Sequence, residues 1–257
     1  MLIAIDIGNS SINIGYFMES GLIVQKIKTI PLKKVNEYSL ILSDFFLQNH
    51  LEKRAFDVII SSVVQSHTSV FKNVFEKLLN NKDKDILIVS HRMNTGLKFK
   101  INSPEELGTD RIANAVGAYE SYKNDVAVVD FGTATTITVV DKDANYIGGS
   151  IMPGIGLMND MLDKGTSKLK KAVLTPPLSA LGADTSGCIC SGLYYGTAGA
   201  VERILDEIEA ETCCRFKVVV TGGYGAIMGK FIKRPHSLNA NLTLEGLRIL
   251  YEKNRSS

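Results

Sequence analysis

Two short acidic turns, each lying between apolar segments, contain the residue types best suited to chemistry in this sequence. The first reads DIGNS from Asp6, and the second reads DFGTATT from Asp130. In each turn an apolar run ends at the aspartate, a glycine follows two residues later, and hydroxyl or amide side chains come next. Such a glycine turn lets backbone N–H groups approach a ligand closely, and the hydroxyl groups add further donors. A carboxylate beside these donors suits a polyphosphate and its accompanying cation.

The two turns are predicted to be the tips of β-hairpins. Residues 1–17 and residues 126–141 each place an apolar, β-branched strand on both sides of the turn, which is the pattern of a hairpin. One such hairpin would be a weak signal, because Asp and Gly are ordinary turn residues. Two copies about half a chain apart indicate a duplicated unit. We therefore expect two related halves that face one another across a cleft, with a phosphate loop on each wall.

The rest of the first half alternates between strand and helix periods. Alternating hydrophobicity over Leu22–Ile30 predicts a third strand, and helical spacing over Leu40–Leu51 predicts an amphipathic helix. The following predicted elements are a buried strand of the parallel type at Phe56–Val64, a helix at Val70–Leu79 and a strand at Asp85–Ser90. Residues 94–107 lack a clear period and are expected to be mostly loop.

A helix with two charged residues in its first turn follows. Within Glu106–Tyr122, apolar residues recur at the i, i+3, i+4 and i+7 positions counted from Ile112, which predicts one buried face. Asp110 and Arg111 come directly after Gly108, at the start of this helix. On the residues alone, two interpretations remain open. Asp110 either favours the helix dipole while Arg111 is solvated surface, or the pair does chemistry.

The second half is predicted to repeat the order of the first. Its expected elements are a strand at Tyr146–Pro153, a helix from Gly154 to Leu162, a long helix at Ser186–Ile208, a strand at Phe216–Gly223 and a terminal helix at Asn241–Lys253. The strand at Phe216–Gly223 ends in a double glycine, which would let phosphate or adenosine approach the backbone. Lysine-rich residues 164–171 are interpreted as a solvated loop.

Composition restricts the class of protein. The chain has 257 residues, of which 45% are hydrophobic and 22% charged, as expected of a soluble globular protein with one large or two ordinary domains. A formal net charge of +2 favours neither a nucleic-acid surface nor a polybasic membrane anchor. No apolar run approaches the ~20 residues of a membrane span, and no signal peptide is visible. We expect a cytoplasmic protein that binds neither nucleic acid nor membrane.

Cysteine and histidine residues give little indication of a site. The four cysteines form two close pairs, Cys188 with Cys190 and Cys213 with Cys214. Neither pair has the usual spacing of a zinc knuckle, so reduced and partly buried thiols are expected. The four histidines (His50, His67, His91 and His236) are scattered, and no catalytic role is expected of them.

The complete set of segments resembles type III pantothenate kinases, a family within the acetate and sugar kinase, Hsc70 and actin superfamily. The matching segments cover nearly the full length and read AIDIGNS, ISSVV, GTDRIANAVGA, VVDFGTATTITVVD, GGSIMPG, GADTSGCICSGLYYG, TGG and LTLEGLRILYEKN. The Asp-x-Gly hairpins specify only the superfamily. GTDR at the start of an alanine-rich helix, followed by DFGTATT, is specific to the family.

This resemblance implies an α/β fold of two ribonuclease H-like (actin-like ATPase) domains, each a mixed sheet flanked by helices. The expected domains are residues 1–114 and 115–257, and the terminal helix could also pack on the first domain. The implied activity is the ATP-dependent phosphorylation of pantothenate to 4′-phosphopantothenate, the first step of coenzyme A biosynthesis. The resemblance also implies a homodimer that uses Mg²⁺ and a monovalent cation, K⁺ or NH₄⁺.

The resemblance also implies roles for individual residues. The first phosphate loop would consist of Asp6, Ile7, Gly8, Asn9, Ser10, Ser11, Ile12 and Asn13, and Thr133 would contact ATP. Pantothenate would be bound by Gly108, Thr109, Asp110, Arg111 and Thr185. Asp6 would hold Mg²⁺ directly or through water, and Asp130 would hold the monovalent cation. Asp110 would accept the proton of the attacking hydroxyl, ionised at neutral pH by its ordinary pKa of roughly 3.9.

Several positions depart from the pattern of the family, and three of them lie in or near the implied site. Ser10 stands where relatives usually have Thr, Thr109 replaces a common Ala, and Ile101 occupies a place where some relatives have an aromatic residue near pantothenate. Two other functions remain open: a kinase of the same superfamily acting on another small alcohol or carboxylate, and a non-catalytic regulator of gene expression. The presence of Asp6, Asp110 and Asp130 argues against the regulator, because a pure binding module needs no such set of carboxylates.

Overall fold

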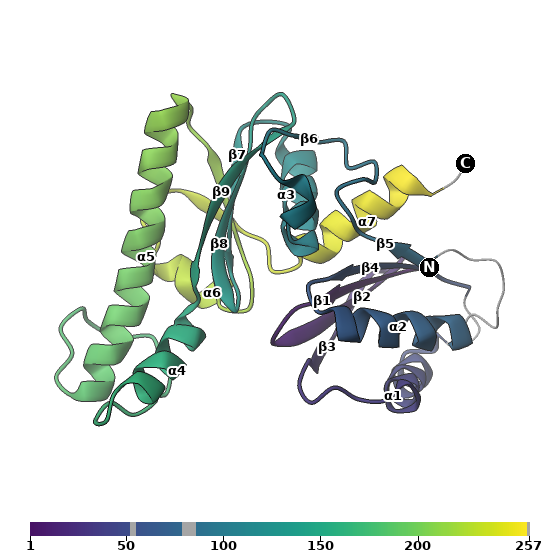
Figure 1. Ribbon diagram of the computed structural model, residues 1–257, viewed down its shortest axis with the longest axis horizontal. Coiled ribbons are helices and arrows are strands. Elements are labelled where there is room, and N and C mark those ends of the chain that lie inside the picture. The colour runs from purple at the N-terminus through teal and green to yellow at the C-terminus, as the bar shows by residue number, and fades with distance from the viewer. Residues whose placement is uncertain (52–54, 79–85, 256–257) are drawn as a thin grey trace. The chain divides into compact units, whose positions relative to one another are not determined.

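The computed structural model describes residues 1–51, 55–78 and 86–255 (Figure 1). The chain forms two compact units. Unit 1 comprises Met1–Leu97, Asn102–Gly117 and Leu242–Ser257, and unit 2 comprises Lys98–Ile101 and Ala118–Asn241. The boundary between them falls inside helix α3 (Thr109–Tyr122), and the C-terminal helix α7 (Leu242–Asn254) belongs to unit 1.

Unit 1 is built on a mixed sheet with the strand order β3-β2-β1-β4-β5. The strands are β1 (Leu2–Ile7), β2 (Ser11–Met18), β3 (Gly21–Lys28), β4 (Asp57–Ser62) and β5 (Ile86–Ile88). Strands β1 to β3 are antiparallel neighbours, whereas β4 is parallel to β1 and β5 is parallel to β4. The prediction of a strand of the parallel type at Phe56–Val64 is therefore confirmed by β4.

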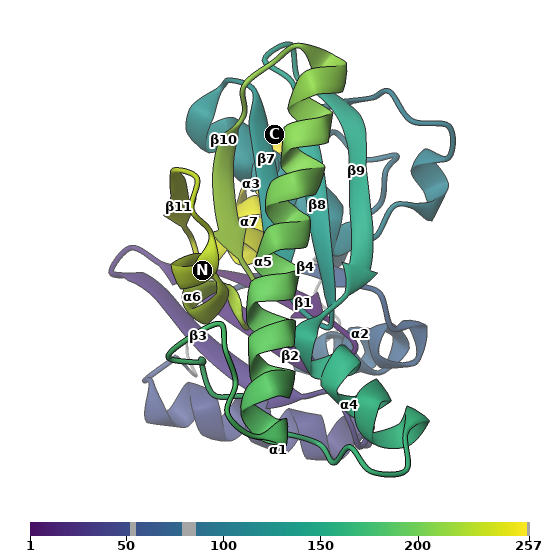
Figure 2. The ribbon, with the colours of Figure 1, turned by 90° about the vertical axis from the view of Figure 1, so that its left-hand side faces the viewer.

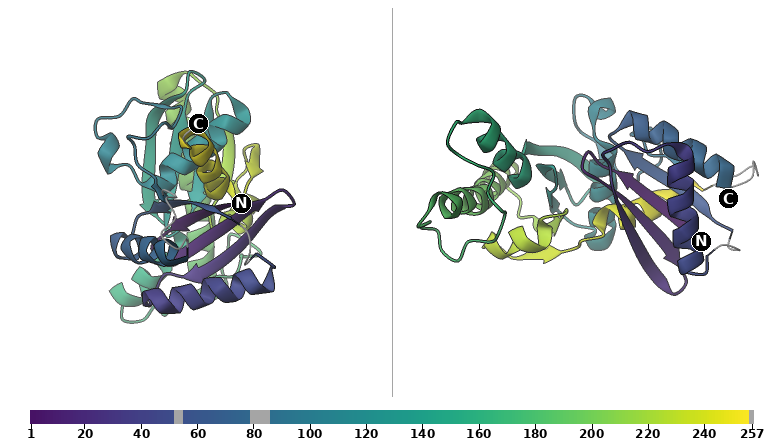
Figure 3. Two further views of the ribbon diagram at one scale, coloured as in Figure 1. Left: turned by 90° about the vertical axis from the view of Figure 1, so that its right-hand side faces the viewer. Right: turned by 90° about the horizontal axis from the view of Figure 1, so that it is seen from below.

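Helices cover both faces of the unit 1 sheet. Helices α1 (Val35–Gln48) and α2 (Gln65–Leu78) pack together on one face, and α7 packs against β1, β2 and β4 on the other (Figures 1 and 3). Burial on both faces explains why β4 is almost continuously apolar. The close approach of α7 to α3 depends on Gly246, because a Cβ there would collide with the backbone of Ala113.

Unit 2 repeats this topology. Its sheet has the order β11-β10-β7-β8-β9-β6. The strands are β6 (Lys98–Phe99), β7 (Val126–Phe131), β8 (Ala134–Val140), β9 (Asn145–Pro153), β10 (Lys217–Thr221) and β11 (His236–Leu238). The series β9-β8-β7-β10-β11 matches β3-β2-β1-β4-β5 in order and in strand direction. The predicted duplication is confirmed, with β6 as an addition in the second copy.

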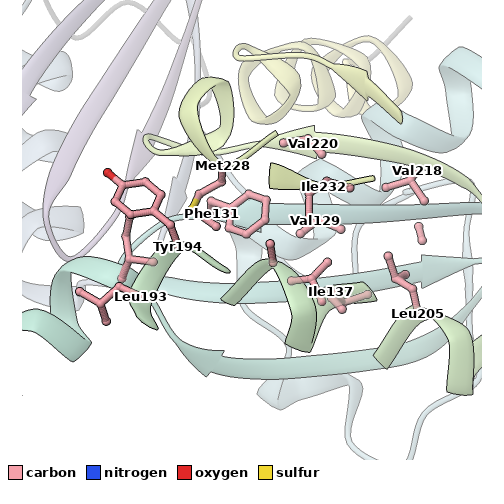
Figure 4. Close-up of a cluster of buried hydrophobic side chains, with 14 of the residues drawn as sticks. Val129, Phe131, Ile137, Leu193, Tyr194, Leu205, Val218, Val220, Met228 and Ile232 are labelled. Atoms are coloured by element: carbon pink, nitrogen blue, oxygen red, sulfur yellow. The ribbon is translucent and has the colours of Figure 1, made fainter. Parts of the chain in front are cut away.

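One long helix covers a face of the unit 2 sheet. Figure 2 shows α5 (Thr185–Thr212) lying along this sheet, with α4 (Ile155–Gly165) and α6 (Gly225–Met228) near its N-terminal half. Phe131 and Val220 from the strands and Tyr194 from α5 belong to the same buried cluster (Figure 4). Each fully buried apolar side chain of this size contributes roughly 1.5–3 kcal/mol. This core holds the inner strands β7 and β10 in place.

The structure differs from the predicted elements mainly at their ends. Helix α2 begins at Gln65, earlier than the predicted start at Val70, and the predicted limits Leu79 and Asp85 lie outside the described residues. The short elements α6 and β11 were not predicted, because neither is long enough to show a hydrophobic period. In the part of the chain that is described, no helix has the length and apolarity required to cross a lipid bilayer.

Candidate functional site

Asp6 lies on the central strand of unit 1, and two neighbouring strands orient its side chain. The strand register pairs Asp6 with Asn13 of β2 and with Ser61 of β4. Its Oδ1 accepts a hydrogen bond from Ser61 Oγ at 3.3 Å, and its Oδ2 is 3.5 Å from Asn13 Nδ2. The half-buried carboxylate is thus positioned by residues from both neighbouring strands.

The turn that follows Asp6 is tight and presents exposed residues. The amide of Gly8 donates to the carbonyl oxygen of Ser11 at 3.0 Å and closes the turn. A Cβ at Gly8 would lie 3.3 Å from that same carbonyl oxygen, which is a crowded contact for a side chain. Asn9 and Ser10, at the tip, are exposed. The predicted phosphate loop is therefore a compact turn whose tip is accessible.

The first residue of α3 is tied to the end of β4. The hydroxyl of Thr109 lies 3.0 Å from Ser61 Oγ, accepts from the amide of Ser62 at 2.9 Å, and lies 3.2 Å from the carbonyl oxygen of Ser62. Since Ser61 also donates to Asp6, a continuous chain of side chains joins Asp6 to the start of α3. Sequence reasoning did not include Ser61 in the site. The available signal was a hydroxyl residue at the end of an otherwise apolar parallel strand.

Asp110 occupies the second position of α3 and is half-buried. Its Oδ1 accepts a hydrogen bond from the amide of Arg111 at 2.8 Å. Burial raises the pKa of Asp110, and this effect outweighs the opposing influence of the Arg111 amide and of the positive charge of Arg111. The ordinary pKa expected from the sequence is therefore wrong, because a sequence position carries no information about desolvation.

Gly108 leaves the space that the carboxylate of Asp110 uses. A Cβ at this position would lie 2.5 Å from Asp110 Oδ1, a distance that real side chains do not reach. Any other residue at position 108 would force Asp110 to move. The glycine of the GTDR segment therefore leaves room for this carboxylate within unit 1.

The second acidic turn belongs to unit 2 and repeats the arrangement of the first. Asp130 is the penultimate residue of β7, as Asp6 is of β1, and the register pairs it with Thr136 of β8 and Thr221 of β10. Gly222 has a φ of +92°, and a Cβ there would collide with Asp130 Oδ1 and with the Phe131 backbone. Glycine is therefore required at position 222 both by its backbone conformation and by the room that Asp130 occupies.

The remaining predicted residues of unit 2 come from two separate elements. Thr133 is exposed in the turn between β7 and β8, and its carbonyl oxygen accepts from the amide of Gly154 at 3.0 Å. Thr185 is the first residue of α5 and is also exposed. It follows the N-cap Asp184, whose Oδ1 accepts from the amide of Gly187 at 2.7 Å.

The donor atoms at the two aspartates suit hard cations. Among the described residues, no three His, Cys, Asp or Glu side chains form a group able to hold a metal ion. Mg²⁺ commonly binds through one or two carboxylates together with water and phosphate oxygens, which fits Asp6 with Ser61 beside it. Asp130 has two threonines as cross-strand neighbours, and its Oδ1 occupies the space that the missing side chain of Gly222 leaves. Its oxygen-rich surroundings fit a monovalent cation.

Comparison with known proteins connects these features to one family. A family model described as type III pantothenate kinase matches residues 2–207. The type III pantothenate kinase of Anaeromyxobacter dehalogenans is 36% identical over 259 aligned positions, which cover 99% of this chain and 100% of that protein. The match therefore extends over both units.

Solved structures with lower sequence identity share the fold. A Campylobacter jejuni protein described as a Baf family transcriptional activator has a TM-score of 0.62 at 19% identity, with 97% of both chains covered. A Sinorhizobium meliloti protein described as a 2-dehydro-3-deoxygalactonokinase has a TM-score of 0.59 at 14% identity, with 98% of both chains covered. The predicted fold class is confirmed: two sheets flanked by helices, as in actin-like ATPases and sugar kinases.

Proposed function

Because this chain belongs to the type III pantothenate kinase family, we propose that it phosphorylates pantothenate at the expense of ATP, with Asp110 as the general base. The product is 4′-phosphopantothenate, the first intermediate of coenzyme A biosynthesis. The observation that supports this proposal most strongly is the chain of contacts from Asp6 through Ser61 to Thr109. It ties a carboxylate suited to a phosphate-bound cation to the helix that carries a second, half-buried carboxylate.

Phosphoryl transfer requires an oriented alcohol, neutralised phosphate charge and little covalent chemistry from the protein. In the proposed reaction, the primary hydroxyl oxygen of pantothenate forms a bond to the γ-phosphorus, and the bond between this phosphorus and the β–γ bridging oxygen breaks. Ionised Asp110 orients the hydroxyl and accepts its proton. General-base assistance of this kind contributes roughly 10²- to 10⁴-fold to the rate. ADP leaves, and Asp110 returns its proton to solvent.

The other residues of the GTDR segment bind the acceptor in this proposal. Gly108, Thr109, Arg111 and Thr185 contact pantothenate. The hydroxyl of Thr109 is engaged by Ser62, so its methyl group or backbone would make the contact with substrate. The guanidinium of Arg111 pairs either with the pantothenate carboxylate or with a phosphate group. Arg can donate two parallel N–H···O hydrogen bonds to either of these anions.

ATP and its cations would use the acidic turns. The loop from Asp6 to Asn13 binds donor phosphates through backbone amides and short polar side chains, and Thr133 contributes a further contact to ATP. Asp6 holds Mg²⁺ directly or through water, and Asp130 holds K⁺ or NH₄⁺. When bound, these cations offset the negative charge that accumulates on the phosphates.

We also propose that the chain acts as a homodimer. Several large apolar side chains of unit 2 are exposed around α4 and the start of α5: Leu157, Met161, Val173, Leu178, Leu181 and Tyr195. Exposed apolar groups gathered in one region are characteristic of protein interfaces. Light scattering coupled to size exclusion should give a mass near twice the 28.1 kDa of the chain, and a monomer at micromolar concentration would contradict the proposal.

The function is tested by measuring ADP release and 4′-phosphopantothenate formation from ATP and pantothenate, with KCl or NaCl as the salt. We expect turnover that depends on pantothenate and on Mg²⁺ and that is stimulated by K⁺. Small sugars and short-chain carboxylates serve as alternative acceptors. Turnover with one of these acceptors and none with pantothenate would show that pantothenate is not the substrate. Absence of nucleotide binding would contradict the assignment as a kinase.

A further inference from the structure

Thr29 holds the turn after Asp6 from behind. This residue directly follows β3 and is only 1% exposed. Its hydroxyl donates to the carbonyl oxygen of Gly8 at 2.7 Å, and its amide donates to the carbonyl oxygen of Ser10 at 3.3 Å. One buried residue therefore contacts carbonyl groups at two points of the predicted phosphate loop.

The contact with Gly8 determines how the tip of the loop faces an anion. In a planar trans peptide, the carbonyl oxygen and the following N–H point in opposite directions. The Gly8 carbonyl is directed at Thr29, so the N–H of Asn9 points away from Thr29. Asn9 itself is exposed. Rotation of this peptide would present the negative end of the dipole to a phosphate in place of an N–H donor. The Thr29 hydroxyl opposes that rotation.

His67 in turn holds Thr29. His67 lies in the first turn of α2 and is 4% exposed. Its Nε2 is 2.8 Å from the carbonyl oxygen of Thr29. A carbonyl oxygen only accepts hydrogen bonds, so Nε2 carries the proton of this bond. The ring also packs edge-on against Tyr38, with centroids 6.5 Å apart. The backbone and side chain of Thr29 are thus fixed between α2 and the loop.

From this arrangement we propose that Thr29 and His67 are positioning residues that keep the loop after Asp6 in its phosphate-binding conformation. The inference rests on the proposed function, because it takes the loop from Asp6 to Asn13 as the site of the ATP phosphates. Neither residue contacts the reacting atoms. Their substitution should weaken the interaction with the phosphate donor while the interaction with pantothenate is retained.

The first test replaces Thr29 by valine, which keeps the shape of the side chain and removes its hydroxyl. We expect Thr29→Val to raise KM for ATP by roughly threefold to tenfold, as the loss of one hydrogen bond allows, with KM for pantothenate changed by less than about twofold. Thr29→Ser retains the hydroxyl and should restore the wild-type KM. An unchanged KM for ATP in Thr29→Val would overturn the proposal.

A matched control separates positioning from general loss of stability. Thr95 of unit 1 is 3% exposed, and its hydroxyl accepts from the amide of Leu97 at 3.0 Å. Thr95→Val therefore removes an equally buried hydroxyl with local backbone contacts. It should lower the melting temperature by an amount similar to Thr29→Val and leave KM for ATP unchanged. A similar rise of KM in both variants would mean that stability alone explains the effect.

His67 is tested through its dependence on Thr29. His67→Leu should raise KM for ATP, and His67→Gln, whose amide can still donate to the Thr29 carbonyl, should do so less. If His67 acts through Thr29, the effects of Thr29→Val and His67→Leu will be less than additive in the double variant. Full additivity would show that the two side chains act independently and would overturn the proposal that His67 acts through Thr29.

Nucleotide binding distinguishes failure of this inference from failure of the proposed function. If the wild-type chain does not phosphorylate pantothenate, the proposed function is wrong. The role of Thr29 in phosphate binding can still be tested by measuring Mg·ADP binding with calorimetry. Weaker binding to Thr29→Val, with wild-type binding to Thr29→Ser, supports the inference in that case. Equal binding to both variants, or no binding to the wild-type chain, overturns it.

Discussion

The hydroxyl of Thr109, at the first position of α3, lies 3.0 Å from the hydroxyl of Ser61, at the end of β4. The two residues are far apart in the chain, and their contact joins the start of the GTDR helix to the strand that orients Asp6. An alanine at position 109 could not make this contact, because it has no hydroxyl group.

Loss of the Thr109 hydroxyl should destabilise the chain. Thr109→Val keeps the shape of the side chain but deprives the Ser62 amide of its acceptor, at a cost of roughly 1–3 kcal/mol. Thermal unfolding should show a lower melting temperature for Thr109→Val and a nearly unchanged one for Thr109→Ser. Equal melting temperatures for the two variants would mean that the hydroxyl contributes nothing measurable.

Replacement of Asp110 by asparagine should abolish most of the turnover. The amide keeps the acceptor for the Arg111 N–H but cannot take the proton of the attacking hydroxyl, so we expect kcat to fall by roughly 10²- to 10⁴-fold. KM for ATP should stay close to wild type. Asp44→Asn, at an exposed position of α1, provides the control. Near-normal turnover by Asp110→Asn would refute Asp110 as the base.

The rate should fall on the acidic side at a pH above the ordinary pKa of an aspartate. Asp110 must be ionised to act as a base, and burial raises its pKa, so kcat/KM should fall with decreasing pH at a value higher than roughly 3.9. The measurement is a profile of kcat/KM for pantothenate at saturating ATP. A limb at or below the ordinary pKa would show that another group controls the rate.

The same pKa shift predicts a gain in stability for Asp110→Asn. A carboxyl whose pKa is raised in the folded state contributes stability below its unfolded pKa of roughly 3.9, and this contribution is lost as pH rises through the folded pKa. At pH 7 the ionised Asp110 therefore costs stability, which the neutral amide avoids. The melting temperature of Asp110→Asn should exceed that of wild type at pH 7, and the difference should shrink as the pH is lowered. A less stable variant at pH 7 would contradict the burial effect.

Gly222→Ala should disturb the surroundings of Asp130. The new Cβ would collide with Asp130 Oδ1, in addition to the strain of a φ of +92°, which costs roughly 1–3 kcal/mol by itself. We expect a lower melting temperature and a loss of K⁺ stimulation. Gly148→Ala is the control, because Gly148 also has a positive φ, +133°, but has no atom within 4 Å of the added Cβ. It should lose stability and retain the response to K⁺.

Local patterns were enough to predict the hairpins, the main helices and the duplication. The segments around Asp6 and Asp130 each contain strand, turn and strand within a few residues, so their structure depends on neighbours in the chain. The prediction was weakest for α6 and β11, which are too short to show a period. It also misplaced the start of α2, where Gln65 and Ser66 precede the periodic residues.

The order of residues along the chain was enough to identify the chemical groups: two acidic glycine turns, a GTDR helix start and the family to which they belong. Which of these groups are in contact became clear only from the folded chain. The register of β1 with β4 brings Ser61 to Asp6, burial raises the pKa of Asp110, and the end of β3 meets α2 where Thr29 and His67 join. These relationships depend on contacts between residues that are distant in the chain. They could not be predicted from hydrophobic periods, because such a period indicates only which side of a helix or strand is buried.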